Sequence, residues 1–183
     1  MERMWRPWRM AYLRDIENRR DEACIFCSKP RAGDDAASLI LHRGETCFII
    51  MNLYPYNTGH VMVAPYRHVG KLEELQEKEA GEIMRLAALA IRAIRREMQP
   101  QGFNLGMNLG KVAGAGFDEH LHLHVVPRWE GDTNFMPVLG ECKVMPESVE
   151  DNYARLRRGL EAVLGEGGKP GGPSSSGMEN PGR

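Results

Sequence analysis

Three histidines stand at alternate positions in the run His120-Leu121-His122-Leu123-His124. Side chains alternate between the two faces of a β-strand, so this spacing predicts three imidazoles on one face and an apolar face opposite. Neighbours on one face stand roughly 6.6 Å apart, which is two rises of ~3.3 Å. This separation suits a row of imidazoles along a chain of phosphates, and we therefore expect an anion-binding row.

A metal site is the alternative for the same histidines, because His-x-His is common in zinc and copper proteins. The strand has no Asp or Glu on the histidine face, since Asp118 has the right parity but precedes it. The pattern alone favours the phosphate row and leaves chelation by the three histidines open.

Two cysteines stand close together in Cys24-Ile-Phe-Cys27. This spacing is typical of a redox pair or of half a zinc site, and a closed tetrahedral site needs two further ligands. A redox dithiol is the less favoured interpretation, because no thioredoxin-like βαβ pattern surrounds the pair. Cys47 and Cys142 are expected to be ordinary core or loop residues.

The elements that must position these residues follow from periodicity. Strands are predicted at residues 39–43, 46–51, 60–64, 103–109 and 120–126, a long helix at 71–98 and a second helix at 147–164. The pattern indicates an α+β domain built on a roughly five-stranded antiparallel sheet, with one long helix and a C-terminal helix. We divide the chain into an arm (1–22), this domain (23–164) and a disordered Gly/Pro/Ser-rich tail (165–183).

The composition restricts the partners. With 24 Lys and Arg against 25 Asp and Glu among 183 residues, no overall charge favours nucleic acid or an anionic membrane. Residues 1–10 do not resemble a signal peptide, and apolar runs are too short to span a bilayer. We expect a cytoplasmic protein that binds neither nucleic acid nor membrane.

The histidine run, followed by Val125-Val126-Pro127-Arg128, resembles the signature of the histidine-triad (HIT) superfamily. Other stretches agree: residues 51–60 resemble its nucleotide-binding stretch, residues 65–68 the start of its long helix, and residues 103–108 the strand before the triad. The Trp-rich start and the Val-Pro-Arg-Trp ending resemble the branch of bacterial diadenosine tetraphosphate phosphorylases and HIT hydrolases.

The resemblance implies a covalent mechanism and a set of site residues. His122 would attack an α-phosphorus and form a nucleotidyl-histidine intermediate, with a backbone carbonyl fixing its tautomer. The other implied residues are His124 for the phosphate and leaving group, His60 as a fourth histidine, Asn108 for phosphate, Asn52 for the ribose, and Gly114 and Gly116 for backbone contacts with phosphates. The implied protein is a two-fold homodimer that hydrolyses or transfers nucleotidyl groups from nucleoside phosphates or dinucleoside polyphosphates.

Two alternatives remain, a nucleoside phosphoramidase and a non-catalytic nucleotide-binding adaptor. Many family members carry Ser, Thr or Gln just before the triad, whereas residues 113–119 here read Ala-Gly-Ala-Gly-Phe-Asp-Glu. That departure weakens the case for a simple phosphoramidase. We expect inorganic phosphate to compete with water, and the Arg-rich arm to shield the intermediate.

The same resemblance completes the cysteine site. In branches that carry the cysteine pair, the ligands map to Cys24, Cys27, His68 and His120, around a structural zinc ion. The proposed chemistry at His122 requires no catalytic metal.

Overall fold

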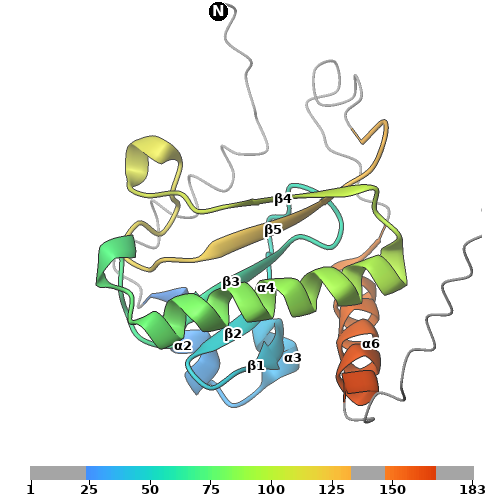
Figure 1. The fold of residues 1–183 in the computed structure, drawn as a ribbon, viewed down its shortest axis with the longest axis horizontal. Helices are drawn as coiled ribbons and strands as arrows, with labels where there is room; N and C mark the ends of the chain where they lie inside the picture. Colours follow the sequence, from blue (N-terminus) through green and yellow to red (C-terminus); the bar gives the residue numbers. More distant parts are fainter. Residues whose placement is uncertain (1–23, 133–146, 168–183) are drawn as a thin grey trace, which may run out of the picture.

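The computed structural model describes residues 24–132 and 147–167. Their centre is a five-stranded sheet in the order β1-β2-β3-β5-β4, with every neighbouring pair antiparallel (Figure 1). The strands are β1 (Ile40–Arg43), β2 (Cys47–Met51), β3 (Val61–Pro65), β4 (Gly102–Gly106) and β5 (Leu123–Arg128). The predicted α+β architecture is confirmed, with one strand at each predicted position.

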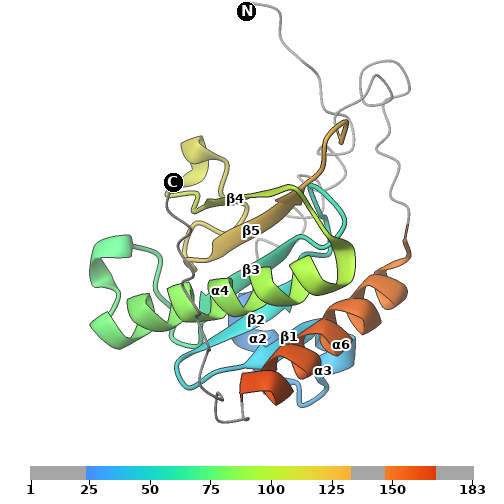
Figure 2. The ribbon, with the colours of Figure 1, turned by 45° about the vertical axis from the view of Figure 1, so that its right-hand side comes forward.

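Helices cover both faces of the sheet (Figure 2). The long helix α4 (Glu77–Met98) and the last described helix, α6 (Val149–Gly167), pack on one face through a core that includes Ile49, Val63 and Leu123. The short helix α2 (Ile25–Arg31) lies on the other face, where Phe26 packs with Phe48 and Met62. Since β2 and β3 are buried on both sides, they form the middle of the domain.

Helix α4 begins later than the periodicity predicts, because residues 72–74 form a 3-10 turn, η1 (Leu72–Glu74). Gln76 caps α4 and forms a reciprocal capping box with Glu79, which satisfies backbone groups at the start of the helix. Gln99 ends it in the left-handed conformation, just before Pro100. Helix α6 runs to Gly167, three residues beyond its predicted end.

The predicted strand at 120–126 is wrong in its first half, because β5 begins only at Leu123. Register explains the late start. Val63 pairs with Leu123, so the residue opposite Leu121 would be Pro65, which has no N–H to donate to the ladder. Leu121 instead donates its backbone N–H to the Val69 carbonyl at 2.7 Å.

Two short helices were not predicted, α2 and α3 (Asp35–Ser38). The predicted arm (1–22), most of the tail (165–183) and Cys142 lie outside the described residues. In the part of the chain that the structure describes, no helix is long and apolar enough to cross a membrane.

Candidate active site and metal centre

His60, His122 and His124 form a row on the α2 side of the sheet, although only His124 of these three belongs to a strand. His122 and His124 lie edge to face with ring centroids 4.8 Å apart, and His124 and His60 follow at 5.1 Å. Met62, a member of the core cluster under α2, is the β3 partner of His124. The structure therefore brings together His60, His122 and His124, from the ends of two neighbouring strands.

His122 has one ring nitrogen engaged by the backbone. Its Nδ1 lies 2.8 Å from the carbonyl oxygen of His120, which can only accept, so Nδ1 carries the proton and Nε2 carries the lone pair. The side chain is buried, and Phe26 stacks on it with ring centroids 4.6 Å apart. Burial lowers the pKa of His122, against the hydrogen bond to His120, which raises it. The result is a neutral imidazole with a nucleophilic nitrogen at neutral pH.

The proton positions on His60 and His124 follow in the same way. The backbone N–H of Tyr56 donates to His60 Nδ1 at 3.0 Å, so His60 Nε2 carries the proton and donates to His124 Nδ1 at 3.0 Å. His124 Nε2 then carries the other proton. That nitrogen is buried and has no hydrogen-bond partner among the described residues. Burial, together with the neighbouring His122, lowers the pKa of His124 to about 4.

The remaining predicted site residues lie just after β2 and in the segment between β4 and β5. Asn52 lies beside His60, with Nδ2 at 3.3 Å from His60 Nδ1 and Oδ1 accepting the N–H of Tyr54. Asn108 lines a pocket together with His124. Gly114 has a φ of 93°, a conformation that favours glycine, and lies with Gly116 in the loop that leads from β4 to the triad.

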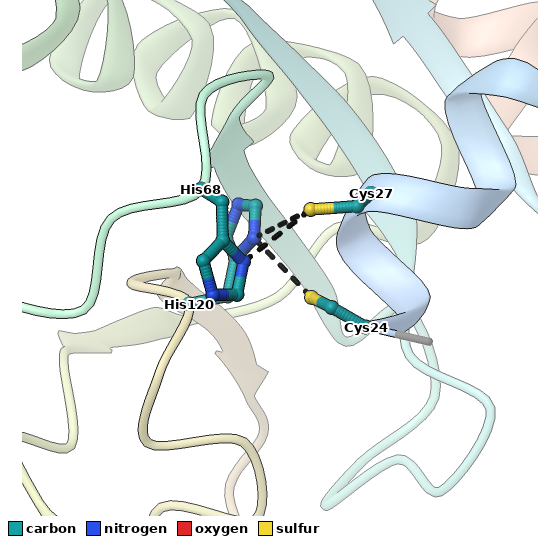
Figure 3. A group of neighbouring side chains, drawn as sticks. All are labelled: Cys24, Cys27, His68 and His120. Atoms are coloured by element: carbon teal, nitrogen blue, oxygen red, sulfur yellow. Dashed lines mark hydrogen bonds between the residues drawn. The ribbon is translucent and has the colours of Figure 1, made fainter. Parts of the chain in front are cut away.

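Cys24, Cys27, His68 and His120 converge at the start of α2 (Figure 3). Their four ligand atoms all lie within 4.8 Å of one another. His120 Nδ1 is 3.3 Å from Cys24 Sγ and 3.5 Å from Cys27 Sγ, while His68 Nδ1 is 3.4 Å from Cys27 Sγ. A tetrahedron with bonds of ~2.0–2.3 Å has edges of about 3.3–3.8 Å, so these three contacts fit one metal ion.

Hydrogen bonding and charge also fit a cation at this cluster. His120 Nε2 donates to the Pro65 carbonyl at 2.9 Å, which leaves Nδ1 unprotonated and directed at the sulfurs. Burial raises the pKa of the Cys24 thiol to about 11 and lowers the pKa of His120 to about 4. A bound divalent cation reverses this preference for the neutral thiol, because it stabilises the thiolate.

Some residues of the site were not predicted from the sequence. Phe26, between the two cysteines, lies against both His120 and His122. Tyr56 covers His60 and His124, at centroid distances of 4.9 and 5.9 Å. The residues that line the pocket beside His124 were missed as well, among them Asn104, Gly106, Arg128 and Asp132. A register for the β4–β5 pair would have found the first three, since it places Asn104 and Gly106 on the face that His124 and Arg128 share.

Residues 34–131 match the HIT domain family. The chain is 44% identical to AP-4-A phosphorylase from Mycobacterium tuberculosis H37Rv over 162 residues, which cover 85% of this chain and 83% of that protein. It is also 32% identical to protein hit from Bacillus subtilis over 112 residues, 61% of this chain and 75% of that protein.

Solved structures agree with the sequence relatives. A zinc-bound histidine triad family protein from Mycobacterium smegmatis superposes with a TM-score of 0.65 at 25% identity, over 79% of this chain and 97% of that one. A hypothetical histidine triad nucleotide-binding protein from Sulfolobus tokodaii gives a TM-score of 0.62 at 26% identity, over 78% and 93% of the two chains. The chain thus belongs to the HIT domain family.

Proposed function

We propose that this protein is a nucleotidyl-transferring enzyme that splits dinucleoside polyphosphates through a covalent adduct on His122, with inorganic phosphate as the acceptor. The observation that carries the proposal is the state of His122: a buried imidazole whose Nδ1 proton is held by the His120 carbonyl at 2.8 Å, so that Nε2 is the nucleophile. The 44% identity to a protein named AP-4-A phosphorylase supports the choice of substrate.

In the first step, the lone pair of His122 Nε2 attacks the α-phosphorus of diadenosine tetraphosphate. The Nε2–P bond forms, the bond from phosphorus to the bridging oxygen breaks, and the electron pair leaves with ATP. In the adduct, His122 Nδ1 keeps its proton and still donates it in a hydrogen bond to the His120 carbonyl oxygen. His124, whose Nε2 carries a proton, donates a hydrogen bond to the phosphate chain and so stabilises charge on the leaving oxygen. Asn52 binds the ribose, and Asn108, Gly114 and Gly116 contact phosphate oxygens.

In the second step, an oxygen of inorganic phosphate attacks the adenylyl phosphorus. The Nε2–P bond breaks, the lone pair returns to His122, and ADP leaves. If water attacks the adenylyl phosphorus instead of inorganic phosphate, the product is AMP. Splitting one displacement into two lets the same imidazole serve as leaving group and nucleophile in turn.

Zinc at Cys24, Cys27, His68 and His120 completes the proposal. As a closed four-ligand site it supplies binding energy to the fold rather than chemistry at phosphorus. The cluster geometry and the zinc-bound relative from M. smegmatis support this assignment. Since His120 also provides the carbonyl that holds His122, the metal ligand and the nucleophile share one short segment.

We further propose that the protein is a two-fold homodimer. Strand β4 stands at the edge of the sheet, and both Leu105 on this strand and Leu109 shortly after it are exposed. Exposed strand edges are usually covered or charged, which supports a partner at this edge. Size-exclusion chromatography with light scattering should give twice the chain mass, and a monomer at micromolar concentration would contradict the dimer.

The test of the function is the product ratio from diadenosine tetraphosphate as phosphate is varied across the millimolar range. We expect ADP and ATP to form faster as phosphate rises, at the expense of AMP. AMP formation that does not respond to phosphate would show that water is the acceptor and that the enzyme is a hydrolase.

A further inference from the structure

A pocket of about 400 Å³ is lined by residues of β4 and β5, His124 among them. Its volume is within the ~300–1,000 Å³ typical of small-molecule sites. His124 and Asn108 line it, and so do Asn104, Gly106 and Arg128, to which the reaction described above gives no role.

Strand register places these residues on one face. Gly106 pairs with His124, Asn104 with Val126, and Gly102 with Arg128. Directly paired residues of antiparallel strands project to the same side, so Asn104, Gly106, His124 and Arg128 share the histidine face. The row therefore continues from His122 through His124 into the pocket.

The order of these groups has a chemical consequence. A group that leaves phosphorus in line departs on the side away from His122 Nε2, and an acceptor that replaces it must arrive from that same side. His124 lies next to His122 at one end and lines the pocket at the other. A phosphate chain that runs from His122 past His124 thus enters the pocket.

The pocket is also lined by an ion pair of fixed geometry, formed by Arg128 and Asp132. Arg128 donates from Nε and Nη2 to the two oxygens of Asp132, at 2.7 and 2.8 Å, and from Nη1 to Asn104 Oδ1 at 2.7 Å. Asp132 receives a further hydrogen bond from Asn57 Nδ2 at 2.7 Å, and its pKa lies well below the usual range because of Arg128. The Arg128 side chain is 44% exposed against 12% for Asp132, so the guanidinium is the accessible side of the pair.

Gly106 keeps the pocket open next to His124. A Cβ built on Gly106 meets no atom within 4 Å. A guanidinium in fixed orientation, amide side chains and open space at Gly106, the strand partner of His124, are features that bind phosphate groups.

We propose that this β4–β5 pocket holds the phosphates of the leaving nucleotide and then the inorganic phosphate acceptor, with Arg128 and Asn104 as residues that determine the choice of acceptor. The proposal rests on the function proposed above, and it assigns the acceptor to a place in the fold. After ATP departs, inorganic phosphate occupies the vacated pocket with one oxygen toward the adenylyl phosphorus, and so competes with water.

Two glycines of β4 provide a matched pair of variants. Gly106→Val fills the pocket, whereas Gly102→Val places the same side chain on the same strand and face, outside the pocket lining. Neither built Cβ meets an atom within 4 Å, and valine is favoured over glycine in strands, so both variants should fold. Melting temperature and zinc content would be measured for both.

The readout is the partition of one adduct between two acceptors. With diadenosine tetraphosphate as substrate, the slope of the ADP-to-AMP ratio against phosphate concentration should fall at least tenfold in Gly106→Val, and kcat/KM for the dinucleotide should fall as well. Gly102→Val should stay within about twofold of the parent, by the usual range for surface changes. Because ADP and AMP arise from the same adduct, general damage to the enzyme cancels in the ratio.

Arg128→Lys provides an independent check, since it keeps the charge and loses the planar fork. In Arg128→Lys, the slope of the ADP-to-AMP ratio against phosphate concentration should fall severalfold. If Gly106→Val does not fold, this variant alone tests the proposal. Partition slopes equal to that of the parent in both variants would overturn the proposal. Failure of the proposed function is distinct: the parent itself would then form no adduct, or AMP independent of phosphate.

Discussion

The tautomer of each histidine in the row depends on a backbone group. The His120 carbonyl fixes the proton of His122, and the Tyr56 N–H fixes those of His60 and, through it, His124. The alternation of histidines could be recognised in the sequence, and so could the need for a carbonyl. Which carbonyl it is, and the stacking of Phe26 on His122, could not, because both depend on segments that meet only in three dimensions.

Replacing His60 tests this chain of hydrogen bonds. In His60→Phe, His124 Nδ1 loses its donor at 3.0 Å, so the proton is no longer held on Nε2. We expect kcat to fall about 10²-fold, within the range for a positioned proton donor. His42→Gln on β1, a half-buried histidine outside the row, is the control and should stay within about twofold. A His60→Phe enzyme as fast as this control would refute the relay.

Among the secondary-structure elements, the five strands and the long helix follow from hydrophobic periodicity and composition, whereas the order of the strands and the start of β5 do not. Extended backbone alternates its side chains whether or not it is paired, so the alternating sequence at residues 120–122 predicts a strand. Only the register against Pro65 shows that pairing stops there. Helices α2 and α3 were missed because helices of seven and four residues carry almost no periodic signal.

The cysteine cluster connects α2 to the segment before β5, so its loss should loosen both. Cys24→Ser should reduce zinc to well below one equivalent per chain and lower the melting temperature by several degrees, because metal binding at such a site contributes to folding. Ser28→Ala, one turn further along α2 and outside the cluster, is the control. Metal analysis of chelator-free protein that finds no zinc would disprove the zinc site and strengthen the redox interpretation.

The contact between α4 and α6 depends on close approach at Gly159. A Cβ there would lie 2.9 Å from the Ala93 carbonyl oxygen, a backbone atom that cannot turn away. Gly159→Ala should lower the free energy of unfolding by about 1–3 kcal/mol, the usual cost of overpacking. Gly81→Ala, on the exposed side of α4 with nothing within 4 Å, should be neutral or stabilising by up to about 1 kcal/mol. Chemical denaturation measures both, and equal effects would contradict the packing argument.

At the scale of the whole molecule, the fold buries neutral histidines in its centre, and this couples stability to pH. The folded pKa of His124 is about 4, below its ordinary value of 6.5, so the unfolded chain binds more protons between these values. The contribution of His124 is therefore complete above about pH 6.5 and is lost as pH falls toward 4.

Comparison with a His124 variant separates the contribution of His124 to stability from any loss of metal at acid pH. Between about pH 7.5 and pH 5, the parent should lose on the order of 1–2 kcal/mol more free energy of unfolding than His124→Gln. Urea denaturation at the two pH values gives the difference. Parallel losses in the two proteins would mean that His124 is not held neutral by the fold.

The adduct on His122 is the central claim, and it separates an enzyme from an adaptor that only binds nucleotides. Diadenosine tetraphosphate would be mixed with excess enzyme without phosphate, and the reaction stopped by denaturation without acid, since the N–P bond is acid-labile. Intact-mass analysis should then show the chain plus one adenylyl group, peptide mapping should place it on His122, and His122→Asn should show none. Nucleotide binding without any adduct, or an adduct that persists in His122→Asn, would contradict the account.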